Sequence, residues 1–109
     1  MTLARTAGLL LALTLLPAAG LADEMDDVTI AVTVLDASHA LLVGRGGNIV
    51  VQHGPDGAFV IDDQFAPLTP RILAAIAGLT DQPVRWLVNT HWHGDHTGGN
   101  QNMGEAGAV

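Results

Sequence analysis

The pattern of hydrophobic and polar residues begins with short β-type segments separated by turn residues. Residues 28–35 are β-branched and apolar, and residues 40–43, 48–52 and 58–61 repeat this character at short intervals. Glycine, proline, aspartate and serine fall between these segments, most clearly in the run Gly-Pro-Asp-Gly at residues 54–57. The pattern therefore predicts an antiparallel meander of four short strands.

The period of the pattern becomes helical after residue 68. Thr69 followed by Pro70 predicts a helix N-cap with proline at the first helical position. Apolar residues then recur at helical spacing on one face, namely Ile72, Leu73, Ile76 and Leu79. Gly78 is placed to close this helix.

A nearly continuous apolar run follows the predicted helix. Residues 84–88 are apolar except for Arg85, which predicts a strand that is buried on most of both faces. Farther along, residues 100–105 are compatible with either a helix or a loop, and residues 106–109 predict the entry to another strand.

Metal-ligand chemistry is concentrated directly after this strand, in the motif His91-x-His93-x-Asp95-His96. Imidazole nitrogen and carboxylate oxygen are ligands that zinc accepts, and imidazole also suits iron, copper and nickel. The motif lies at the carboxyl end of a strand, the edge where loops of sheet-and-helix folds collect ligands. The sequence therefore predicts a metal site here.

The spacing of the motif divides it into two pairs of ligands. His91 and His93 are two positions apart, so in extended backbone both project to the same side. Gly94 then allows a sharp bend that aims Asp95 and His96 at a neighbouring point. A catalytic zinc usually takes three protein ligands and a water. Two adjacent metals are thus expected, each needing at least one more ligand from elsewhere.

The remaining histidines and the large aromatic residues are assigned structural roles. His39 and His53 fall beside turn signals and are predicted to be exposed loop residues, with completion of a metal site as the alternative for either. Trp92 lies between two ligands and is predicted to pack against the scaffold rather than to wall a substrate cleft. Trp86 and Phe65 are interpreted as core or cleft lining.

Residues 1–22 read as a secretory signal peptide. Arg5 supplies a positive start, residues 7–16 an apolar stretch, and small residues lead to a cleavage site before Asp23. The apolar stretch is shorter than the ~20 residues that span a bilayer, so no membrane attachment is expected after cleavage. The chain has no cysteine that could carry a lipid anchor. A periplasmic or secreted destination is expected.

The charge of the expected mature chain argues against nucleic-acid partners. All 11 acidic residues follow Ala22, against three arginines and no lysine, which gives a formal charge of −8. Binding to phosphate backbones depends on lysine and arginine. A small-molecule substrate is the expected partner.

The run from Asn89 to Asn100, together with the strand end at Phe59-Val60-Ile61-Asp62-Asp63, resembles the signature of the metallo-β-lactamase-fold hydrolases. This resemblance covers residues 28–109. It implies an αβ/βα sandwich of the α+β class, of which this chain supplies the N-terminal half: antiparallel strands, one helix and a buried strand leading to the metal motif. Residues 23–109 are accordingly expected to be a partial domain whose C-terminal half is missing.

The resemblance also implies roles for individual residues. His91 and His93 match the ligands of one metal, and Asp95 and His96 match ligands of the second. In the family a hydroxide bridging two zinc ions is the nucleophile, and the residue matching Asp95 orients it, so Asp95 is the candidate catalytic residue. Asp62 matches a carboxylate that supports the motif loop, although a helix-capping or solvated aspartate is an equal alternative from the residues alone.

Three functions follow as hypotheses. The first is an exported zinc-dependent hydrolase of an acyl-type bond in a lactam, lactone, ester or thioester. The second is a mononuclear iron dioxygenase of the same fold, because imidazole and carboxylate ligands also suit Fe(II). The third is a secreted metal-binding or vestigial fragment without catalysis, which would take up metal without hydrolysing an ester or lactam.

Overall fold

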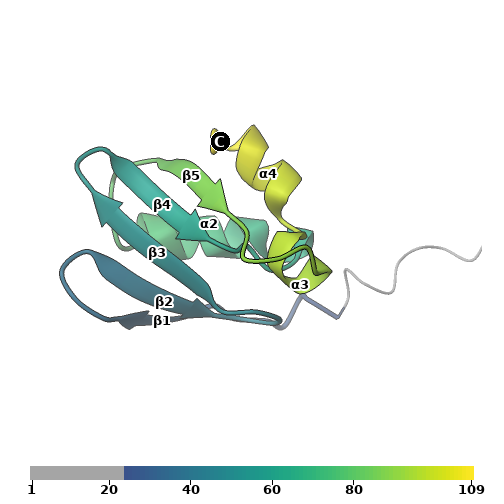
Figure 1. The fold of residues 1–109 in the computed structure, drawn as a ribbon. Coiled ribbons are helices and arrows are strands. Elements are labelled where there is room, and N and C mark those ends of the chain that lie inside the picture. The colour runs from purple at the N-terminus through teal and green to yellow at the C-terminus, as the bar shows by residue number, and fades with distance from the viewer. Residues whose placement is uncertain (1–23) are drawn as a thin grey trace, which may run out of the picture.

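The structure is a computed structural model that describes residues 24–109, so the expected signal peptide at residues 1–22 lies outside the described residues. Figure 1 shows a single sheet with helical segments on one face and at one end. In chain order the elements are β1 (Ala31–Val34), β2 (His39–Val43), β3 (Ile49–Gly54), β4 (Gly57–Ile61), the 3-10 helix η1 (Ala66–Leu68), α2 (Thr69–Ala77), β5 (Val84–Val88), α3 (Gly94–Thr97) and α4 (Asn100–Glu105). This arrangement confirms the predicted α+β class.

The sheet has the strand order β1-β2-β3-β4-β5. The first four strands pair antiparallel with their neighbours, which confirms the predicted meander. β5 pairs parallel with β4, with Ile61 opposite Val88. A parallel pair needs a crossover connection, and η1 and α2 provide it. The carboxyl ends of β4 and β5 consequently lie side by side, and both lead into polar loops.

The core lies between α2 and one face of the sheet. Helical spacing places Ile72 and Ile76 of α2 on the buried side, as the sequence predicts, and Met103 of α4 joins them. Burying each such side chain contributes roughly 1.5–3 kcal/mol relative to leaving it exposed. The sheet contributes every second residue of its central strands, and the buried members are Ala40, Leu42, Ile49, Val51, Ala58, Val60 and Val84.

The opposite face of the sheet is open among the described residues. Strand β5 was expected to be buried on most of both faces, and this prediction is wrong, because Trp86 is 39% and Val88 48% exposed. The residues on this face alternate along each strand with the core residues. One row of cross-strand neighbours on it consists of Thr33, Leu41, Val50, Ile61 and Val88. No described helix covers that row.

Smaller differences from the predictions occur at the ends of the helices. Thr69 is the first residue of α2 rather than its N-cap, and Leu68 takes that position without a side-chain bond. Residues 100–105 form α4, which resolves the choice between helix and loop. Val109 hydrogen bonds through its main-chain groups to Arg85 and Leu87, at 3.0 and 2.9 Å, in the manner of a further parallel strand.

Within residues 24–109, none of the helices has the length and apolar character needed to cross a membrane.

Candidate metal centre

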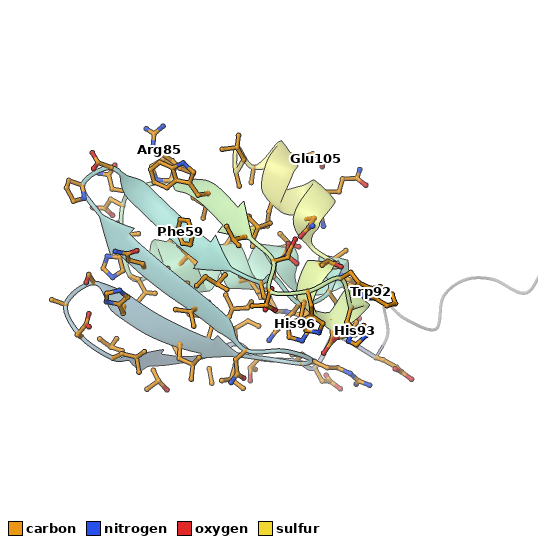
Figure 2. All side chains as sticks on the ribbon, viewed as in Figure 1. Phe59, Arg85, Trp92, His93, His96 and Glu105 are labelled. Atoms are coloured by element: carbon orange, nitrogen blue, oxygen red, sulfur yellow. The ribbon has the colours of Figure 1, made fainter. Side chains whose placement is uncertain are left out.

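The histidine motif leaves the carboxyl end of β5 and enters the short helix α3. His93 precedes α3 in extended backbone (φ −62°, ψ 144°), and Gly94 begins the turn that carries Asp95 and His96. Figure 2 shows His93 and His96 together at this end of the sheet, with Trp92 directed outward. The local fold is the bend at Gly94 that the sequence predicts.

The four predicted ligands form two facing pairs. His91 Nε2 lies 3.1 Å from His93 Nδ1, and His96 Nε2 lies 3.4 Å from Asp95 Oδ2. Two ligands bound at about 2.0–2.1 Å in tetrahedral geometry are roughly 3.3 Å apart, so both spacings suit a shared zinc-sized ion. The ring centroids of His91 and His96 are 4.0 Å apart, so the two pairs lie next to each other.

No group of three or more His, Cys, Asp or Glu side chains within residues 24–109 meets around one point. The donors therefore occur as two pairs. Since a catalytic zinc usually has three protein ligands, each pair supplies part of a coordination sphere.

Asp62 fixes the tautomer of His96. The Asp62 carboxylate lies at the end of β4, is 3% exposed, and accepts a hydrogen bond from His96 Nδ1 at 2.7 Å. With the proton on Nδ1, His96 Nε2 keeps its lone pair and faces Asp95. A carboxylate on the second nitrogen is the usual support of a metal-binding histidine. The donor chemistry at His96 therefore fits a divalent metal.

A second path from Asp62 reaches His91 through Thr90. The Thr90 hydroxyl donates to Asp62 Oδ2 at 2.7 Å, and the Thr90 main-chain N–H donates to Oδ1 at 2.8 Å. Because the only hydroxyl proton is used, Thr90 Oγ1 accepts from His91 Nδ1 at 2.9 Å. His91 Nε2 is then left with its lone pair directed toward His93. Through these contacts the Asp62 carboxylate leaves one imidazole nitrogen without a proton in each pair.

The same contacts keep Asp62 ionised. Burial alone would raise the pKa of Asp62, but the hydrogen bonds from His96 and Thr90 outweigh it and hold the pKa below its usual range. These contacts support the interpretation of Asp62 as the carboxylate beneath the motif loop. The alternatives of a helix cap or a solvated side chain do not describe a group in these surroundings.

Asp63 is a further buried carboxylate at this end of the sheet, and the sequence alone assigns it no role. Burial raises the pKa of Asp63 to about 6, against the bond that Gly99 N–H donates to Oδ1 at 3.0 Å, and the charge of Asp62 adds to the rise. The main-chain N–H of Asp63 also donates to His96 O at 3.1 Å. The sequence feature that points to Asp63 is the run of three polar residues, Asp-Asp-Gln, directly after an apolar strand.

The roles predicted for Trp92 and for the histidines outside the motif are wrong. Trp92 does not pack against the scaffold; it is 83% exposed, and its nearest ring is His93 at 4.9 Å. His91 and His93 face each other across 3.1 Å on one side of this extended segment, so the residue between them projects from the other side. His39 and His53 are half-buried strand residues rather than exposed loop residues, because strands β2 and β3 are longer than expected.

Trp86 and Phe65 were both interpreted as core or cleft lining. Phe65 packs against the buried core, in agreement with that interpretation. Trp86 is 39% exposed on the open face and lines an open pocket together with His53 and Phe59, which agrees with the second alternative, cleft lining. This pocket is formed at the β3–β4 turn, and its lining contains none of the four predicted ligands.

The fold is a mixed sheet-and-helix arrangement with three imidazoles and a carboxylate clustered at one end of the sheet. A family model described as the metallo-beta-lactamase superfamily matches residues 34–109, and the chain belongs to this superfamily. Members of the superfamily typically bind metal ions, commonly zinc. No sequence among the curated proteins matches the chain.

Solved structures of similar fold agree with the family. The Rm3 metallo-beta-lactamase has 26% identity and a TM-score of 0.63, over 71% of this chain and 29% of that chain. A variant of the FEZ-1 metallo-beta-lactamase from Legionella gormanii has 18% identity and a TM-score of 0.59, over 71% and 30%. Metallo-beta-lactamase SMB-1 bound to 2-mercaptoethanesulfonate has 22% identity and a TM-score of 0.57, over 64% and 28%. The match spans less than a third of each relative.

Proposed function

We propose that this chain carries the principal metal-binding loop of an exported zinc-dependent hydrolase that acts on an acyl-type bond of a lactam, lactone, ester or thioester. The observation that carries the proposal is the pairing of four donors, with Asp62 leaving a free nitrogen on both His91 and His96. Zinc at these pairs would polarise the scissile carbonyl and make water a nucleophile near neutral pH.

Each residue around the candidate metal centre has a role in this proposal. His91 and His93 would hold one ion, and Asp95 and His96 the other, 3.1 and 3.4 Å being suitable spacings. Asp95 is 40% exposed at its side chain, so its carboxylate is also accessible to orient an attacking water. Thr90 and Asp62 would keep the imidazole nitrogens unprotonated on the metal side throughout turnover.

Export is part of the proposal and rests on residues 1–22. Expression in a bacterium with a general secretion pathway should yield a periplasmic or secreted chain that begins at Asp23. Mass spectrometry of the exported chain checks this. A chain that stays in the cytoplasm with Met1 in place would contradict it.

Zinc titration of the purified chain tests the metal site. We expect weak binding that is abolished in the variant H91A/H93A/D95A, because each pair offers only two protein ligands. His39 and His53, the two histidines outside the motif, provide matched controls. The variants H39A and H53A should bind zinc as the parent chain does. Binding that survives the triple variant, or that is lost in H53A, would contradict the proposed site.

Hydrolysis of a chromogenic ester or lactam separates the catalytic hypothesis from simple metal binding. We expect slow, zinc-dependent turnover that disappears in D95N. Metal uptake without any turnover, by this chain and by a longer relative with the same motif, would instead support the non-catalytic interpretation.

A further inference from the structure

The pair Asp95–His96 is enclosed by two main-chain segments that are remote in the sequence. One is the glycine loop, which we define as Gly44–Gly47 between β2 and β3. Gly47 N–H donates to Asp95 O at 3.2 Å. A Cβ atom on Gly47 would overlap His96 Cε1, so the imidazole rests directly against the glycine main chain. The glycine loop is therefore one wall of the site.

The second segment is the polar turn after β4, and Gln64 joins it to the glycine loop. The Gln64 side-chain amide donates to Gly47 O at 2.7 Å. Its main-chain carbonyl accepts from Gly98 N–H at 2.8 Å, and Gly98 is the C-cap of α3, the turn that carries Asp95 and His96. Gln64 thus bonds to the glycine loop on one side of the Asp95–His96 pair and to the end of α3 on the other.

This arrangement is energetically unfavourable for Gln64 itself. Gln64 is fully buried and has a left-handed main chain (φ 57°), a conformation that residues other than glycine adopt rarely. Its Oε1 atom is buried and has no hydrogen-bond partner among the described residues. Strained backbone and unpaired buried polar atoms occur preferentially at functional sites, where other contacts maintain them.

We propose that Gln64 is a positioning residue of the candidate metal centre: by clamping the glycine loop against α3, it holds the His96 ring in the orientation that directs Nε2 toward Asp95. The inference rests on the proposed function, because the pair that Gln64 positions is the pair assigned to the second metal. Gln64 itself lies outside the set of ligands and acts through Gly47 and Gly98.

The test uses two variants of Gln64 and site-resolved spectroscopy. Gln64→Asn keeps an amide and tolerates the left-handed main chain, but it is one methylene too short to reach Gly47 O. Gln64→Met keeps the length and lacks the donor. Long-range ¹H–¹⁵N spectra of the histidine rings then report the tautomer of each histidine, first without metal and then during zinc titration.

We expect both variants to change the ring resonances of His96 in the metal-free chain, because the imidazole loses the wall that Gly47 provides. Zinc affinity at His96 should fall roughly tenfold, as is typical when the support of a ligand is removed. The spectrum of His91 and its zinc affinity should stay within about twofold of the parent. Unchanged His96 spectra in both variants would overturn the proposal.

Asn102→Leu is the matched control, because Asn102 is another partly buried amide that donates to a main-chain carbonyl, Ala66 O at 3.1 Å. Asn102 makes none of the contacts that enclose Asp95 and His96. Its variant should leave the His96 spectrum unchanged, and an equal effect would show general loosening and overturn the proposal. If the parent chain bound no zinc, the proposed function would fail, while the metal-free spectra would still decide the role of Gln64.

Discussion

Asp62 is the residue at which the contacts of the candidate metal centre converge. It accepts from Thr90 and His96, and through Thr90 it also orders His91. A neutral amide at this position offers only one accepting oxygen, so one of these donors would lose its partner. The orientation of both imidazoles therefore depends on a single buried charge.

The variant Asp62→Asn should lower zinc affinity by roughly 10–100-fold, the usual effect of removing a carboxylate behind a metal-binding histidine. Competition with a chromogenic chelator measures this directly. Asp36→Asn is the control, because Asp36 also accepts from a histidine, His39 Nδ1 at 2.9 Å, but at an exposed turn. Equal zinc affinities in Asp62→Asn and the parent would exclude Asp62 from the site.

Asp63 predicts a pH dependence of stability. Its pKa is raised to about 6 in the folded chain from 3.8, so between these values the folded state keeps a proton that the unfolded state has released. The free energy of unfolding should therefore fall as the pH rises from about 4 to about 6. The contribution is on the order of 2–3 kcal/mol.

Urea unfolding at a series of pH values, compared between the parent and Asp63→Asn, isolates this contribution. Asparagine retains an oxygen for the Gly99 N–H, which preserves the hydrogen bond, and it does not titrate. The difference in unfolding free energy between the two chains should change across pH 4–6 and be flat above pH 7. A difference that is constant with pH would rule out the raised pKa.

At the scale of elements, the glycine loop and α3 are fitted to each other. Gly46 has φ +100°, and a Cβ there would approach Asp95 Cβ to 2.9 Å, so the turn and the close approach both require glycine. Sequence patterns identified this run correctly as a break between strands. They did not indicate its position against the metal motif, because the partners are almost fifty residues apart.

Gly47→Ala should destabilise the chain by roughly 1–3 kcal/mol, because the added methyl group overlaps the His96 ring. Gly54→Ala provides the comparison, since a Cβ at Gly54 meets nothing within 4 Å. That variant should be neutral or slightly stabilising. Denaturant midpoints measure both effects, and similar midpoints for the two variants would show that the glycine loop does not press on His96.

Considered as a whole molecule, the described chain has one buried and one open sheet face. Val43 and Val88 on the open face are 40% and 48% exposed. Contiguous exposed apolar surface promotes non-specific association, and the expected charge of −8 opposes it at low salt. We therefore expect aggregation of the chain to increase with ionic strength.

The double variant V43T/V88T should reduce this aggregation while keeping β-branched residues in the strands. Val32→Thr is a matched control, because Val32 is 41% exposed but pairs with buried Leu42 and so belongs to the opposite face. Light scattering at 0.05 and about 0.5 M salt, where screening differs strongly, compares the three chains. An equal reduction in Val32→Thr would show that the open face has no special part in aggregation.

The sequence by itself determined the features that depend on neighbouring residues. The alternation of apolar residues predicted four strands, the helical spacing predicted α2, and the cluster His91, His93, Asp95 and His96 predicted two pairs of candidate ligands on one short loop. Each depends on spacing along the chain, which periodicity and donor chemistry reveal directly.

Only the tertiary structure decided what surrounds those ligands. The contacts of Asp62 with His96 and of Gln64 with Gly47 join residues 34 and 17 positions apart. The first arises because parallel pairing brings the ends of β4 and β5 together, and the second because antiparallel pairing places the start of β3 beside the end of β4. The tautomers of His91 and His96 follow from their hydrogen bonds to Thr90 and Asp62, and the raised pKa of Asp63 follows from its burial. Burial and hydrogen bonding are properties of packed neighbours, which a linear pattern does not contain.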